Sequence, residues 1–118
     1  MSQRYLLDTN IISDLVRNPQ GDVMKKIREL GEESICTSII VASELRFCAT
    51  RKESEKLTQR VEVILSAMEI IPFEEPADCH YAAIRNLLKK KGRPIGPIDL
   101  LIAAQALSLN LIVVTANT

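Results

Sequence analysis

The sequence has few aromatic residues and no excess of charge of either sign. It contains no tryptophan, and two tyrosines and two phenylalanines are its only aromatic residues. We therefore do not expect nucleic-acid recognition through extensive stacking of bases on aromatic side chains. Fifteen basic residues balance fifteen acidic ones, so the net charge is zero. Any binding of a polyanion has to depend on a local cluster of basic residues.

Cysteine and histidine patterns typical of zinc sites are absent. Cys36, Cys48 and Cys79 are widely spaced and form no CxxC pair. We expect them to be reduced and structural. His80 is the only histidine and has no zinc or triad partner in the sequence, so we expect it to pack on a helix or lie at the surface.

Long hydrophobic runs are absent as well. No apolar stretch approaches the roughly 18 residues that cross a membrane, and the N-terminus lacks the layout of a signal peptide. The sequence thus predicts a cytoplasmic protein with no membrane association. A chain of 118 residues with 47% hydrophobic content is expected to form one compact domain.

Short hydrophobic segments alternate with segments of helical periodicity. The pattern predicts strands at 4–7, 34–37, 69–73 and 111–115, and helices at 11–17, 21–30, 38–50, 52–68, 77–91 and 97–109. Asn10 is the expected N-cap of the first helix. Helices that separate short hydrophobic strands indicate parallel pairing. The predicted fold class is α/β, a three-layer α/β/α sandwich with a central parallel sheet.

Three carboxylates follow or interrupt apolar runs. They are Asp8 in YLLDTN, Glu44 in IIVASELRF and Asp99 in GPIDLLIAA. An ionised carboxylate drawn towards the interior is costly unless something compensates its charge. A divalent cation shared by all three would do so. Mg²⁺ prefers oxygen ligands, and Mn²⁺ can substitute for it, so the pattern predicts a metal site suited to hydrolysis.

Each of these carboxylates also has a purely structural explanation. Asp8 can form a turn or cap after the first strand. Asp99 falls in the first turn of a helix, where the dipole favours a negative charge. Glu44 shares its helix face with apolar residues such as Ile40 and Phe47, but can still reach solvent or an ion-pair partner. The metal site is lost only if all three structural explanations hold.

Taken together, these segments resemble a known family. From LLDTNIISDL through SIIVASELRFCA and GRPIGPIDLLIAAQAL to LIVVTAN, the sequence is similar to PIN-domain ribonucleases of the VapC type, the toxins of bacterial toxin–antitoxin pairs. The resemblance covers essentially the entire chain. It implies a single PIN domain over residues 1–118 that lacks the short helix and final strand with which the family usually ends.

The resemblance also implies an activity, a cofactor and partners. It implies a magnesium-dependent endoribonuclease toxin in which Asp8, Glu44 and Asp99 are catalytic and bind the metal. Asn117 occupies the family's fourth position and implies a contact to the metal through water. Family members generally cleave structured cellular RNA, often tRNA, form homodimers and are neutralised by a cognate antitoxin.

Four further residues are candidates for binding the substrate. Thr9 and Thr115 flank the predicted carboxylate cluster, and Arg46 and Arg93 can contact phosphate. Arg93 belongs to KKKGR, which can equally be a solvated, basic helix end.

Two other functions remain open at this point. A phosphatase or phosphotransferase with Asp8 as nucleophile would explain LLDTN, but Asn10 stands where the haloacid dehalogenase signature has a second aspartate. A catalytically silent PIN-like module that binds RNA or protein is the second alternative. Cleavage of RNA that depends on metal and on Asp8 distinguishes the ribonuclease from both.

Overall fold

The computed structural model describes residues 3–93 and 95–115. In chain order its elements are β1 (Tyr5–Leu7), α1 (Thr9–Arg17), α2 (Asp22–Leu30), the 3-10 helix η1 (Glu32–Ser34), β2 (Ile35–Ser38), α3 (Ile39–Arg51), α4 (Glu55–Ser66), β3 (Glu69–Ile71), α5 (Ala77–Lys90), α6 (Pro97–Leu109) and β4 (Ile112–Val114). None of the helices within the described ranges is long and apolar enough to span a bilayer.

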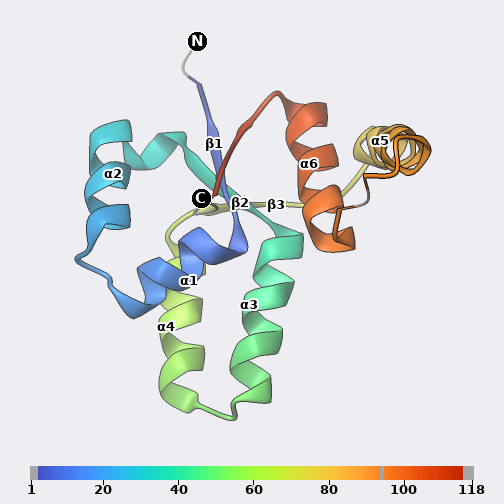
Figure 1. Cartoon of the computed structure of the whole chain (residues 1–118). Coiled ribbons are helices and arrows are strands. Elements are labelled where there is room, and N and C mark those ends of the chain that lie inside the picture. Colours follow the sequence, from blue (N-terminus) through green and yellow to red (C-terminus); the bar gives the residue numbers. More distant parts are fainter. Residues whose placement is uncertain (1–2, 94, 116–118) are drawn as a thin grey trace.

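All four strands belong to one parallel sheet, in the order β3-β2-β1-β4. Leu6 of β1 lies opposite Cys36 of β2 on one side and Val113 of β4 on the other. Helices flank this sheet, with α2 to the left of the strands and α5 and α6 to the right in Figure 1. The predicted fold class, a parallel sheet covered by helices, is confirmed.

The core lies where β1 and β2 meet the helices α1, α3 and α4. Leu6, Ile12 and Val41 have no exposed surface, and α1 contacts both α3 and α4. Short apolar strands covered on both faces are typical of parallel sheets. At the sheet edge, β4 is less covered, and Ile112 and Val113 are exposed.

Local signals in the sequence determine where several helices begin and end. The hydroxyls of Ser38 and Ser54 accept backbone amide bonds and cap the starts of α3 and α4. Pro97 stands in the first turn of α6, where its missing N–H costs nothing. Asn110, with a left-handed φ of 56°, ends the same helix.

The N-cap predicted for α1 was wrong. Asp8 rather than Asn10 caps this helix, because Asp8 is still extended and its Oδ1 accepts a hydrogen bond of 3.0 Å from the backbone amide of Ile11. The chain therefore turns into the helix directly after β1. As a result, Asp8 is held at the carboxyl end of a central strand.

Helix α5 packs chiefly on α6, on the side of α6 that faces away from the strands (Figure 1). Ala77, Tyr81, Ile84 and Leu88 recur at helical spacing, which predicts that they share an inward face. Ala77 is buried, but the other three are only partly buried. Periodicity identifies the apolar face of a helix correctly here. It does not reveal that a single neighbouring helix covers this face.

The sequence LLIAAQAL in α6 is apolar almost all round, which predicts a buried helix, but α6 is only partly buried. Leu100 and Ile102 are buried, whereas Leu107 and Leu109 are 58% and 47% exposed. Buried residues continue along α6 as far as Ala106, and the exposed leucines belong to its last turn. Exposure of α6 therefore depends on position along the helix as well as on the face.

The three cysteines are free, and they differ in environment. Cys36 is buried in β2, where its Sγ donates a hydrogen bond of 3.5 Å to the Tyr5 carbonyl oxygen and burial raises the pKa of the thiol. Cys79 is exposed on α5. His80, beside it, is half-buried, which fits the packing or surface position predicted for it.

Candidate active site

A cavity of about 410 Å³ opens at the carboxyl ends of β1 and β4. The strand order places β2 and β3 on one side of β1 and β4 on the other, so the direction of chain progression reverses between β1 and β4. Open parallel sheets bind ligands at such a reversal. The polar side chains around the cavity are Asp8, Asn10, Asp99 and Thr115.

Asp8 is held by its backbone as well as by its side chain. Its amide donates a bond of 3.1 Å to the Val114 carbonyl, which continues the pairing of β1 with β4. Its own carbonyl accepts from the Ile12 amide at 3.2 Å, and Oδ1 caps α1 through Ile11. The cap occupies Oδ1 and does not use Oδ2. Asp8 therefore combines a structural role with a carboxylate at the cavity.

Asp99 approaches the same cavity from the first turn of α6. The apolar sequence around Asp99 predicted that it is drawn into the interior, but it is exposed. It stands at the positive end of the helix dipole, and it makes no hydrogen bond or ion pair with the described residues. The tertiary fold thus brings together two carboxylates from the opposite ends of the chain.

Glu44 lies in the second turn of α3, is partly buried, and does not line this cavity. The apolar face predicted around it is incomplete, because Phe47 is 61% exposed. Like Asp99, Glu44 makes no hydrogen bond or ion pair with the described residues. The metal-binding role of Glu44 stays a prediction.

Of the remaining candidates, Thr115 lines the cavity and Thr9 begins α1 beside Asp8. Arg93 is exposed in the loop after α5, away from the cavity lining. Asn117, the predicted fourth position, lies outside the described residues. Asn10 was not among the predicted site residues, yet it lines the cavity. Its position in DTN, two residues after Asp8, was the available signal.

The donor set at the cavity suits a hard cation. Within residues 3–93 and 95–115, no three His, Cys, Asp or Glu side chains cluster closely enough to bind one metal ion. The two carboxylates Asp8 and Asp99, with the oxygen-bearing side chains Asn10 and Thr115, remain. Mg²⁺ commonly takes one or two protein carboxylates and completes its octahedron with water and phosphate oxygens. The residues present therefore fit magnesium or manganese better than a softer metal.

Arg46, a predicted phosphate contact, has a partner within the protein. Its Nε and one terminal nitrogen donate to the two carboxylate oxygens of Glu62 at 2.9 and 3.0 Å, which joins α3 to α4. This hydrogen bonding raises the pKa of Arg46 and lowers the pKa of Glu62. Contact of Arg46 with RNA stays a prediction.

The Arg46–Glu62 pair gives a pH-dependent prediction. Because the pKa of Glu62 is lowered in the folded state, the pair stabilises the protein above the unfolded-state pKa and loses this effect as the pH falls through the folded-state pKa. We expect Glu62→Gln to reduce the free energy of unfolding by about 0.5 kcal/mol at pH 7. Urea unfolding at pH 7 and below about pH 4 measures this, and the difference should disappear at the lower pH. An equal loss at both pH values would contradict the ion-pair explanation.

A buried amide network supports the helix that carries Asp99. Gln105 of α6 is 1% exposed, and its Nε2 donates to the carbonyls of Ile71 at 2.8 Å and Pro72 at 2.9 Å. The Ser38 hydroxyl donates to its Oε1. Gln105 thus connects α6 to the ends of β2 and β3. The sequence interpretation did not include it, although a lone amide inside an apolar helix was the available signal.

Comparison with known proteins agrees with this fold. The family model described as PIN domain matches residues 5–118. The chain therefore belongs to the PIN-domain family. Within that family it is similar to VapC proteins. It is 32% identical to the tRNA(fMet)-specific endonuclease VapC of Shigella flexneri over 116 residues, which are 98% of this chain and 87% of the relative.

A second VapC relative and a similar solved structure both come from Rickettsia felis. Ribonuclease VapC2 of Rickettsia felis is 33% identical over 115 residues, which are 96% of this chain and 86% of the relative. The crystal structure of VapBC2 from Rickettsia felis bound to a DNA fragment from its promoter contains a chain that superposes with a TM-score of 0.90. That chain is 31% identical, and the match covers 98% of this chain and 89% of the solved one.

Proposed function

We propose that this protein is a divalent-metal-dependent endoribonuclease and acts as the toxin of a toxin–antitoxin pair. The observation that carries the proposal is the convergence of Asp8 and Asp99 on one cavity at the carboxyl edge of the sheet. Membership of the PIN-domain family and similarity to proteins named as VapC ribonucleases support the same function.

In the proposed mechanism Asp8 and Asp99 hold Mg²⁺, or Mn²⁺ in its place, and Glu44 acts with them. When bound, the metal supplies a Lewis acid for the phosphodiester and lowers the pKa of a water molecule. Asp8 contributes a carboxylate that the cap and the sheet hold rigidly. Asp99 contributes a second negative charge from a helix start, and Thr115 and Asn10 contribute polar groups at the cavity rim for water and phosphate oxygens.

The same proposal includes the substrate and the partners. The Shigella flexneri relative is named for cleavage of tRNA(fMet), so we propose tRNA as the substrate class, cleaved in the cytoplasm. The solved neighbour from Rickettsia felis is a VapBC2 complex, which supports a cognate antitoxin for this chain. We further propose a homodimer, which size-exclusion chromatography with light scattering can test.

Removal of the metal tests the proposed reaction. We expect the purified protein to cleave tRNA in Mg²⁺, to lose this activity in EDTA, and to regain it on addition of excess Mg²⁺ or Mn²⁺. Gel analysis of end-labelled tRNA gives the rate, and mapping of new 5′ ends gives the cut position. Asp99→Asn should also lose the activity. Asp78→Asn is its matched control, because Asp78 stands in the first turn of α5 as Asp99 does in α6 but does not line the cavity.

Two other results would each point to a different function. Tight RNA binding without cleavage in either metal, across a broad panel of RNAs, would indicate the silent binding module. Cleavage that persists in EDTA would contradict the assigned role of Asp8 and Asp99 and would indicate metal-independent chemistry.

A further inference from the structure

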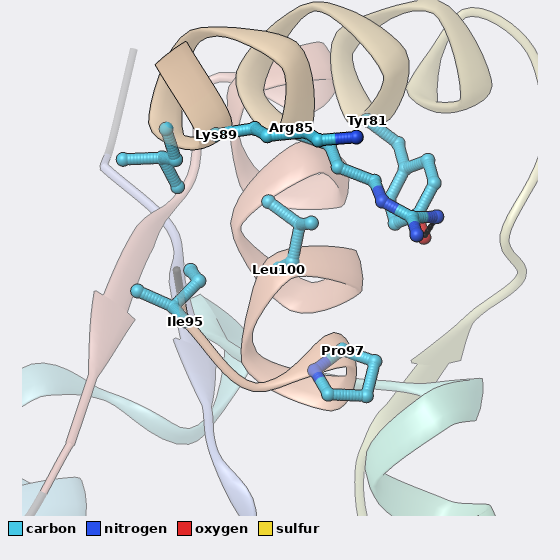
Figure 2. A pocket seen from close by; sticks show the side chains of 7 residues that line it. Tyr81, Arg85, Lys89, Ile95, Pro97 and Leu100 are labelled. Atoms are coloured by element: carbon cyan, nitrogen blue, oxygen red, sulfur yellow. Dashed lines mark hydrogen bonds between the residues drawn. The ribbon is translucent and has the colours of Figure 1, made fainter. Parts of the chain in front are cut away.

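A second cavity, larger than the first, lies between α5 and α6. Its volume is about 510 Å³. Figure 2 shows Tyr81, Arg85 and Lys89 extending from α5, opposite Ile95, Pro97 and Leu100 from the loop and from α6. One wall is thus apolar and the other carries two cations. This cavity shares no lining residue with the cavity of Asp8 and Asp99.

The segment around this cavity is the most basic part of the chain. Residues 79–98 contain no aspartate or glutamate, whereas the chain as a whole is neutral. The basic residues in this segment are Arg85, Lys89, Lys90, Lys91 and Arg93. Within the described residues none of the five forms an ion pair with an acidic side chain. Unpaired cations gathered in this way attract a polyanion.

Arg85 is already held in a defined position. Its guanidinium donates a hydrogen bond of 2.9 Å to the Tyr81 hydroxyl and lies 5.8 Å from the centre of the Tyr81 ring. Both contacts involve one neighbour on the same helix and leave most of the five guanidinium N–H donors unused. A guanidinium ordered in this way binds phosphate at a smaller entropic cost than a free one.

The two cavities lie on opposite faces of the start of α6. Pro97 and Leu100 line the α5–α6 cavity, whereas Asp99 lines the other, and about 100° of rotation separates successive helical residues. An α-helix with its side chains is about 10–12 Å across. A polynucleotide with one linkage at Asp8 and Asp99 can therefore continue around the N-terminus of α6 into the second cavity.

We propose that the α5–α6 cavity is a subsite for a nucleotide of the RNA substrate that flanks the cleaved linkage. Its phosphate binds Arg85 and Lys89, and its base packs against Leu88, Ile95 and Pro97. This subsite rests on the proposed ribonuclease function. A second copy of the chain fits this surface less well, because a two-fold interface would place the same basic segment of both copies together.

The double variant Arg85→Gln/Lys89→Gln tests the subsite. Both side chains are exposed, so the fold should remain intact, which urea unfolding can verify. The matched control is Lys25→Gln/Arg28→Gln, which removes two exposed cations from α2. With tRNA as substrate we expect the first variant to raise KM about 10-fold and to leave kcat within about twofold. The control should change neither.

Equilibrium binding separates this proposal from the proposed reaction. The anisotropy of labelled tRNA, measured in EDTA between about 50 and 200 mM salt, gives the slope of log affinity against log salt. In Arg85→Gln/Lys89→Gln this slope should be shallower than in wild type by about one unit per lost cation. An unchanged KM and slope would overturn the subsite and leave the ribonuclease intact. If the wild-type protein binds tRNA with the expected slope but never cleaves it, the proposed ribonuclease function alone is overturned. Loss of dimers or of antitoxin binding, with RNA affinity unchanged, would reassign the surface to a protein and overturn the subsite.

Discussion

Asp8→Asn is expected to lower the rate of tRNA cleavage by at least about 100-fold. Loss of a residue that only orients a metal ligand costs up to about 100-fold, and loss of a ligand itself should cost at least as much. The variant loses the anionic oxygen that the proposed metal requires. It should nevertheless fold as well as wild type, because asparagine caps a helix about as well as aspartate and can accept the same bond from the Ile11 amide. Cleavage rates and urea midpoints measured on the same preparations test both parts.

Asp8→Ala separates the two roles of this residue. It removes the carboxylate and the cap together, so activity should be lost as in Asp8→Asn, and the free energy of unfolding should also fall by about 1 kcal/mol. In cells, sites cleaved by wild type and absent with Asp8→Asn would identify the target RNA. If Asp8→Asn kept more than about a tenth of the wild-type activity, a direct metal-binding role for Asp8 would be excluded.

Gln105→Leu is expected to reduce the free energy of unfolding by about 3 kcal/mol, a large fraction of the roughly 5–15 kcal/mol that stabilises a domain. Leucine has a similar volume but leaves the Ile71 and Pro72 carbonyls without their donor and the Ser38 hydroxyl without its acceptor. Each unpaired buried group costs about 1–3 kcal/mol. Urea unfolding at neutral pH measures the loss.

Gln59→Leu is the control for this prediction. It makes the same substitution at an exposed position of α4 and should change stability by less than about 0.5 kcal/mol. If Gln105→Leu cost less than about 1 kcal/mol, the three hydrogen bonds would not be holding α6 against the sheet.

Local sequence signals predicted most of the elements because these signals depend on interactions between residues that are close in the sequence. Ser38 caps a helix start through a hydrogen bond within its own segment, and Pro97 marks another start because its missing N–H costs nothing there. Ser54, which caps α4, was not recognised as a helix start. The predicted ends of the helices and strands were less accurate. The third strand was predicted at 69–73 but ends at Ile71, before Pro72, and α4 covers residues 55–66 of the predicted 52–68. Proline cannot donate to a ladder, which explains the shorter strand.

Glu44 shows the limit of periodicity as evidence for a site. Its apolar helical neighbours supported a place in the interior, yet Phe47 among them is largely exposed and Glu44 lies outside the cavity. Arg46 shows the same limit for charges, since its partner Glu62 comes from a different helix. Helical spacing states which residues share a face. It does not state which other element covers that face or pairs with it.

By itself the sequence determined the α/β class, the order of the elements and the family, because all three depend on patterns along the chain. Only the tertiary structure decided that Asp8 and Asp99 share a cavity and that Glu44 does not line it. The tertiary structure also placed a basic cavity between α5 and α6. These features depend on the order of the strands and on which helix packs against which. Both follow from burial of the whole core, to which distant parts of the chain contribute together.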